Sequence, residues 1–189
     1  MDPETLAICA QVTEILARLG ISYVLGGSLA SSKHGYPRSS NDADMVADIR
    51  EDEVAALVAA FEEDFYIASE AVADAVSREA SFNVIHYEKA VKVDIFVAGT
   101  SAFAREELRR ATLGEVAGFV FRFASPEDTI LAKLRWFRDG GEVSERQWTD
   151  VLGVLAVQAG RLDLPYLATT ADDLGVADLL ASALAAAND

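Results

Sequence analysis

The sequence has little cysteine, no long apolar segment and little positive charge. Cys9 is the single cysteine among 189 residues, so no disulfide can form within the chain. No apolar run approaches the roughly 20 residues that a membrane-spanning helix needs. The acidic start, residues 1–4, also lacks the basic residues of a secretory signal. We therefore expect a cytoplasmic protein in a reducing compartment, with no membrane contact.

Positive charge is scarce, because 16 Lys and Arg residues face 31 Asp and Glu residues, which leaves a formal charge of −15. A protein that grips long nucleic acid usually presents a basic face. General DNA binding is therefore not expected. Basic residues do gather in segments 105–110 and 133–138. They can form a local basic patch or simply lie on solvated helix faces, and the sequence leaves both explanations open.

Apolar residues make up 51% of the chain, enough for a folded core. Helical periodicity predicts helices over residues 3–19, 51–63 and 103–110, and apolar runs predict strands over 21–25, 42–49, 82–87, 91–97 and 119–123. From Ser125 onward the pattern is helical only, beginning with an N-cap serine followed by Pro126. We predict an α+β protein, in which a mixed β-sheet core flanked by helices (residues 1–124) precedes a helical C-terminal part (residues 125–189).

Three aspartates stand out. Asp42 and Asp44 begin a predicted strand, and alternation in a strand points both side chains to one side, roughly 6–7 Å apart. Asp94 interrupts an apolar strand, where a lone carboxylate is rarely tolerated. Like charges on one face are costly unless a cation bridges them or one carboxyl is protonated. If the strands are neighbours, the three carboxylates form a site for hard divalent ions, Mg²⁺ or Mn²⁺.

The sequence resembles the nucleotidyltransferase superfamily of DNA polymerase beta over most of residues 22–155. That family has a hydrophobic strand, Gly-Gly or Gly-Ser, a short helix, Asp-x-Asp and an acid on a later strand. Here these are Tyr23 to Ser28, Asp42-Ala43-Asp44 and Asp94. Within the superfamily it is most similar to the bacterial branch of AbiEii-type toxins, which carry Arg-x-Thr-x-Asp-x-Asp, then a Lys and then an Arg and an Asp. Arg38 opens the first segment, with Ser40 in place of Thr.

The resemblance assigns roles to nine residues. Asp42 and Asp44 would hold the ions and the nucleotide phosphates, and Asp94 would also help to deprotonate the acceptor hydroxyl. Six residues would contact the nucleotide: Gly27, Ser28, Arg38, Lys133, Arg146 and Asp150. Where relatives often repeat an Asp three residues after Asp150, this chain has Gly153.

Five of these residues have a structural alternative. Gly27 and Ser28 can be a turn and a helix cap. Lys133 lies on the flank of an apolar helix stripe, where it can snorkel without a function. Arg146 and Asp150 are four residues apart and can form an exposed ion pair.

The leading hypothesis is a nucleotidyltransferase that moves a nucleoside monophosphate from an NTP to a hydroxyl, with Mg²⁺ or Mn²⁺. In the toxin-like branch, the acceptor would be RNA, such as a tRNA end, or a protein, and an antitoxin-like partner would accompany the enzyme. Two alternatives remain. One is a small-molecule, antibiotic-type nucleotidyltransferase, for which the acidic charge would suit a cationic acceptor. The other is a non-catalytic nucleotide-binding or partner-binding protein that keeps the fold.

Overall fold

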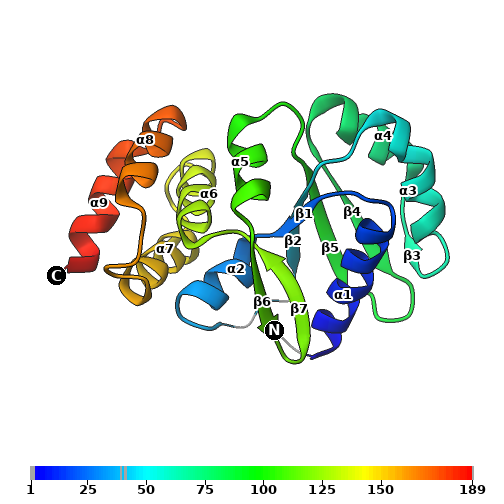
Figure 1. The fold of residues 1–189 in the computed structure, drawn as a ribbon, viewed down its shortest axis with the longest axis horizontal. Helices are drawn as coiled ribbons and strands as arrows, with labels where there is room; N and C mark the ends of the chain where they lie inside the picture. Colours follow the sequence, from blue (N-terminus) through cyan, green and yellow to red (C-terminus); the bar gives the residue numbers. More distant parts are fainter. Residues whose placement is uncertain (1–2, 39, 41, 189) are drawn as a thin grey trace. The chain divides into compact units, whose positions relative to one another are not determined.

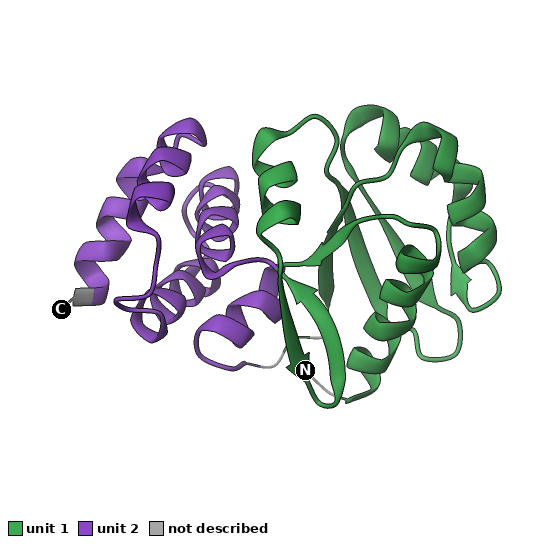
Figure 2. Cartoon of the chain, in the orientation of Figure 1, with its two compact units in different colours: residues 1–26, 39–123 green, residues 27–38, 124–189 purple. Residues whose placement is uncertain are grey.

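The computed structural model describes residues 3–38, 40 and 42–188, which form two compact units. The first unit comprises residues 1–26 and 39–123, and the second comprises residues 27–38 and 124–189 (Figure 2). Each unit is considered by itself below. Within the described residues, no helix is long and apolar enough to cross a membrane.

The first unit is built on a mixed sheet, which has seven strands among the described residues, in the order β3-β4-β5-β2-β1-β7-β6. The parallel pairs are β2 with β5 and β1 with β7, whereas the other neighbours are antiparallel. The strands are β1 (Tyr23–Leu25), β2 (Ala43–Ala47), β3 (Phe65–Tyr66), β4 (Ser81–His86), β5 (Lys92–Val97), β6 (Thr112–Val116) and β7 (Phe119–Phe123).

Three helices of the first unit, α1, α3 and α5, follow from the amphipathic stretches that the periodicity predicts, and α4 is a further helix (Figure 1). α1 packs on β7 and on α3, and α4 packs on α3 and β4, while α5 packs on β1 and β2. Their bounds are α1 (Pro3–Arg18), the 3₁₀ turn η1 (Glu51–Glu53), α3 (Val54–Phe61), α4 (Ser69–Arg78) and α5 (Ala102–Arg110).

The two faces of the sheet differ in burial, because side chains alternate along each strand. In β2, Ala43, Met45 and Ala47 are fully buried, and the alternate residues Asp44 and Val46 are only half-buried. β5 repeats the pattern, with one face buried through Val93, Ile95 and Val97. The aspartates therefore lie on the less buried face of the central strands.

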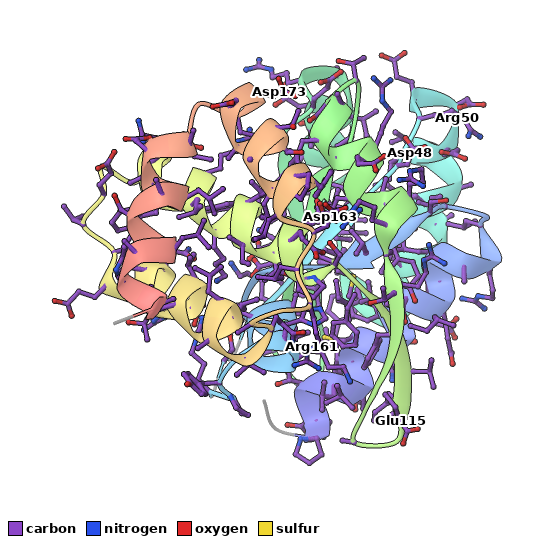
Figure 3. All side chains as sticks on the ribbon, turned by 60° about the vertical axis from the view of Figure 1, so that its left-hand side comes forward. Asp48, Arg50, Glu115, Arg161, Asp163 and Asp173 are labelled. Atoms are coloured by element: carbon purple, nitrogen blue, oxygen red, sulfur yellow. The ribbon has the colours of Figure 1, made fainter. Side chains whose placement is uncertain are left out.

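The second unit is helical. α2 (Gly27–His34) packs against α6 (Pro126–Asp139) and α7 (Glu145–Val157), and α8 (Leu164–Asp173) and α9 (Ala177–Asn188) complete it. Ser125 caps α6 by accepting a hydrogen bond from the Asp128 N–H, with Pro126 in the first turn. Asp163, labelled in Figure 3, caps α8 in the same way through the Tyr166 N–H.

The predicted fold class is confirmed, since the structure is α+β with a mixed sheet and a helical C-terminal part. The apolar runs do not predict β3 or β6, which are an edge strand of two residues and a strand interrupted by Gly114. Residues 27–38 were expected within the core, whereas this segment packs with the C-terminal helices. The physical reason is that α2 buries its residues against α6 and α7, which are distant in sequence.

Candidate functional site

Asp44 and Asp94 stand side by side on parallel strands. The register of β2 and β5 pairs these two residues directly, on strands that lie about 4.8 Å apart in such a sheet. Asn83 of β4 stands on the other side of Asp94 in the same cross-strand row. The Gly26 N–H, just after β1, donates to the Asp44 carbonyl oxygen at 3.0 Å. Two carboxylates are thus held at neighbouring positions by backbone pairing on both sides.

Asp42 lies one residue before β2 and is exposed. The strand is therefore shorter than predicted, and Asp42 lies just outside the residues that pair with β5. Its carbonyl oxygen accepts a hydrogen bond from the Ser40 hydroxyl at 3.1 Å. At the other end of the strand, Asp48 is also exposed and follows β2 directly (Figure 3).

Lys92 is a cationic neighbour of these acids that the sequence analysis did not single out. Its Nζ lies 2.7 Å from Oδ2 of Asp94, and both side chains are partly exposed, at 42% and 23%. The hydrogen bond with Asp94 raises the pKa of Lys92, and the charges of Asp94, Asp42 and Asp44 raise it further, against the opposing effect of burial. The signal was present in the sequence, since Lys92 is two residues before Asp94 and so shares its face of β5.

The donor set fits a divalent ion of the Mg²⁺ type. Among residues 3–38, 40 and 42–188, no group of three or more His, Cys, Asp or Glu side chains is arranged to hold a metal ion. Mg²⁺ does not require one, because it is usually bound by one or two carboxylates together with waters and substrate phosphates. The adjacent carboxylates of Asp44 and Asp94 supply that number, and the Lys92 ammonium lies against the carboxylate of Asp94.

The Gly-Gly-Ser turn is divided between the two units. Gly26 ends the β1 side, and Gly27 begins α2 with a φ of 52°, in the left-handed region that glycine adopts without strain. Ser28 is buried. The side chain of Glu107, on α5, is also buried, and its Oε1 would lie 3.9 Å from a Cβ on Gly26. The phosphate-binding role of Gly27 and Ser28 stays a prediction.

In the second unit, three predicted residues meet at one carboxylate. Asp150 of α7 accepts two hydrogen bonds from Arg38, to Oδ1 from Nε at 2.8 Å and to Oδ2 from a terminal nitrogen at 2.9 Å. Lys133 of α6 lies 2.8 Å from Oδ2 of the same carboxylate. The Ser31 hydroxyl of α2 donates to it at 3.1 Å. We call these four residues the Asp150 cluster.

The charges of the Asp150 cluster compensate the burial of Asp150. Burial by itself raises the pKa of this carboxyl, but the hydrogen bonds and charges of Arg38 and Lys133 outweigh it and hold the pKa below its usual range. The side chains of Lys133 and Asp150 are only 8% and 6% exposed, whereas that of Arg38 is 26% exposed. A bidentate Arg–carboxylate pair with a second cation is a strong, geometrically defined interaction.

Two expectations for this region are corrected. The alternative reading of Arg146 and Asp150 as an exposed ion pair is wrong, because Asp150 is buried and pairs with Arg38 and Lys133, while Arg146 is exposed. Lys133 is not on a solvated helix flank, since it is buried where α2, α6 and α7 meet. Periodicity along one helix could not reveal this, because the partners come from other helices.

The predicted basic segments include residues that are paired with acids. Arg109 donates two hydrogen bonds to Glu106 within α5. Arg135 pairs with Asp139, and Arg138 pairs with both Glu142 and Asp178. For these residues, the contacts favour the explanation that they lie on charged helix faces and do not form a free basic patch.

No protein-family model and no curated protein matches this sequence. Solved structures do. An antigenic nucleotidyltransferase-like protein from Paracoccidioides brasiliensis matches with a TM-score of 0.55 at 16% identity, covering 97% of this chain and 94% of that chain. ANT(2")-Ia in complex with adenylyl-2"-tobramycin matches with a TM-score of 0.59 at 13% identity, covering 92% and 97%. The lincomycin-bound lincosamide antibiotic adenylyltransferase LnuA matches with a TM-score of 0.53 at 11% identity, covering 83% and 98%.

At these identities the likeness is one of fold, and it covers most of each chain. The chain therefore has the fold of nucleotidyltransferases, as the Gly-Gly-Ser and Asp-x-Asp segments predicted. The finer resemblance to the AbiEii-type branch stays a prediction.

Proposed function

We propose that this protein is a metal-dependent nucleotidyltransferase that moves a nucleoside monophosphate from an NTP to a hydroxyl. The observation that carries the proposal is the pairing of Asp44 and Asp94 on β2 and β5, on the less buried face of a sheet with the nucleotidyltransferase fold. Two adjacent carboxylates repel each other, and the single Lys92 ammonium offsets only part of that repulsion, so the pair suits a ligand that brings more positive charge.

The proposed reaction gives these groups the roles that the resemblance implies. The acceptor oxygen attacks the α-phosphorus of the NTP, the bond from the α-phosphorus to the bridging oxygen breaks, and pyrophosphate leaves. Asp94 accepts the proton of the acceptor hydroxyl, which makes the oxygen a better nucleophile. Asp42 and Asp44 would hold Mg²⁺ or Mn²⁺ together with the phosphates. When bound, the ion neutralises charge that develops on the phosphate oxygens.

The proposed nucleotide contacts of the second unit are Gly27, Ser28, Arg38, Lys133, Arg146 and Asp150. The contacts within the Asp150 cluster support different roles for Arg38, Lys133 and Asp150. Lys133 and Asp150 are the buried members, and they fix the guanidinium of Arg38, which is the more exposed of the three. Arg38 is therefore the member that we propose contacts phosphate, with Lys133 and Asp150 positioning it.

Thermal stabilisation tests the metal and nucleotide assignment. Mg²⁺ or Mn²⁺ with an NTP, each NTP tried separately, should raise the melting temperature, since ligand at about 100 times its Kd adds about 2.7 kcal/mol. The double variant Asp42→Asn with Asp44→Asn should lose the metal-dependent part of this shift. Asp48→Asn is the matched control, because Asp48 is an exposed acid at the other end of β2. An undiminished shift in the double variant would refute the assignment.

Label transfer tests catalysis. Wild-type protein incubated with α-labelled NTPs and a pool of acceptors should transfer label, and Asp94→Asn should not, although it still binds NTP. The substitution is nearly isosteric, and it should destabilise the transition state of the transfer more than the bound NTP. Tight NTP binding without transfer to any pool would favour the non-catalytic alternative.

The acceptor has two candidate classes. The formal charge of −15 favours a cationic small molecule, such as an aminoglycoside, because an acidic surface attracts it and repels RNA. The resemblance to AbiEii-type toxins favours RNA or protein and implies an antitoxin-like partner. Separate pools of total RNA, lysate protein and cationic small molecules distinguish these classes by which pool takes the label.

A further inference from the structure

Lys92 is a charged residue at the paired aspartates to which the proposed reaction gives no role. It comes from β5, two positions before Asp94, and its ammonium contacts Oδ2 of Asp94 at 2.7 Å. The parallel pairing of β2 with β5 begins at Ala43 and Val93. Asp42 and Lys92 directly precede these two residues, so they lie at the same end of the two strands. The pKa of Lys92 is raised by the negative charges of Asp94, Asp42 and Asp44. We call these three acids the aspartate trio.

We propose that Lys92 is an internal counter-ion of the aspartate trio, which a metal–triphosphate displaces but a free divalent ion displaces poorly. The inference rests on the proposed function and deepens it, because it assigns the site a preference for metal–nucleotide over metal alone. Without a ligand, the ammonium offsets the repulsion among three carboxylates. When a divalent ion binds, the ammonium must leave Asp94, and a triphosphate supplies the negative oxygens to which it then donates.

The exposure of the ion pair makes such an exchange physically reasonable. With 42% of the Lys92 side chain and 23% of the Asp94 side chain exposed, the pair is hydrated, and pairs of this kind contribute little to stability. Displacement by a ligand therefore costs no more than a few-fold in affinity. Without a triphosphate, however, the displaced ammonium has no anion to move to and stays near the ion, and a positive charge about 5 Å from a divalent ion weakens its binding about tenfold at low ionic strength in a water-like medium.

Lys92→Met tests the inference, since methionine keeps the length of the side chain and removes the charge. Binding of Mn²⁺ is measured from the loss of the free-ion signal in electron paramagnetic resonance, with Mn²⁺ alone and with Mn²⁺ plus tripolyphosphate. We expect Lys92→Met to bind Mn²⁺ alone about tenfold more tightly than wild type. It should bind Mn²⁺ with tripolyphosphate several-fold more weakly, because the ammonium that would pair with phosphate is gone.

Two further variants give the comparison its specificity. Lys92→Arg keeps the charge and should restore both affinities to near the wild-type values. Lys89→Met is the matched control, because Lys89 is 44% exposed and pairs with an acid, Glu4, on another element of the same unit. It should leave both affinities unchanged.

The outcomes separate this inference from the proposed function. Equal Mn²⁺ affinity in wild type and Lys92→Met would overturn the role of Lys92 and leave the metal site standing. Equal effects of Lys92→Met and Lys89→Met would also overturn it, since bulk charge would then explain both. If neither protein bound Mn²⁺, with or without tripolyphosphate, the proposed function would fail and the inference with it.

Discussion

At the scale of single residues, Asp150 shows how one carboxylate can organise three helices. It receives hydrogen bonds from Ser31 of α2 and from Arg38, which follows α2, and it pairs with Lys133 of α6. Because the side chains of Lys133 and Asp150 are almost fully buried, neither charge can be satisfied by water if the other is removed. The cluster is therefore expected to matter for stability as well as for any nucleotide contact.

Removing Lys133 should destabilise the protein without any ligand. Lys133→Ala leaves Asp150 with one cation and opens a void where α2, α6 and α7 meet, so we expect the free energy of unfolding to fall by about 3 kcal/mol. Chemical denaturation measures this. Lys89→Ala is the control, since Lys89 is 44% exposed and its ion pair with Glu4 should be worth less than about 1 kcal/mol. Equal losses in the two variants would show that burial of Lys133 is not what stabilises the fold.

The depressed pKa of Asp150 predicts a pH dependence with a definite sign. A folded-state pKa below the ordinary value of 3.8 means that the contribution of Asp150 to stability is present above pH 3.8. It is lost as the pH falls through the folded-state pKa. The difference in unfolding free energy between wild type and Asp150→Asn should thus be greatest near neutral pH and shrink in acid. A difference that grows on acidification would contradict the assignment.

At the scale of elements, the approach of α2 to α7 depends on glycine. A Cβ on Gly35 would lie 2.7 Å from the Val154 nitrogen and 2.8 Å from the Gly153 carbonyl carbon, both backbone atoms. A Cβ on Gly153 would lie 3.1 Å from the Tyr36 ring. A side chain at position 153 would therefore require the Tyr36 ring to shift by a few tenths of an ångström.

Gly35→Ala should therefore separate α2 from α7. Since backbone atoms cannot move aside like a flexible side chain, we expect a loss of about 2 kcal/mol or more in the free energy of unfolding. Gly140→Ala is the control within the same unit, because Gly140 has a φ of −82°, which alanine adopts, and the nearest atom to its Cβ would be 3.2 Å away. Gly140→Ala should change stability by less than about 1 kcal/mol. Equal effects would exclude the close approach as the cause.

At the scale of the whole molecule, the net charge of −15 predicts a response to salt. Self-repulsion destabilises a compact state, and salt screens it, the Debye length falling from about 30 Å at 0.01 M to about 8 Å at 0.15 M. The melting temperature should therefore rise by a few degrees between about 10 and about 150 mM NaCl.

A charge-reversed variant provides the control for this response. Glu62→Lys with Glu63→Lys exchanges two exposed acids after α3 and changes the formal charge from −15 to −15 + 4 = −11. Its melting temperature should depend less on salt than that of wild type. A melting temperature that falls with salt in both proteins would mean that attractive ion pairs, rather than net repulsion, dominate the electrostatics of the fold.

Local patterns in the sequence were sufficient for the fold class and for placing Asp44 and Asp94 on strands, whereas the pairing of those two strands was only a condition of the predicted site. Alternation and apolar runs located β2, β5 and β7, and the run over 82–87 located β4 to within a residue, because strand residues facing a core must alternate. The site of metal and nucleotide chemistry that the sequence predicts remains a proposal. Local pattern had no means to detect β3 and β6, since edge strands bury little and carry a weak signal.

By itself, then, the sequence determined which residues alternate, which helices are amphipathic and that Asp44 and Asp94 lie on strands. Only the tertiary structure decided the partners of charged side chains. The ion pair of Lys92 depends on where a flexible side chain ends, and the meeting of Arg38, Lys133 and Asp150 depends on three helices that pack from distant parts of the chain. Periodicity reports which face of an element is buried, but a charge pairs with whichever opposite charge the packing brings within about 4 Å.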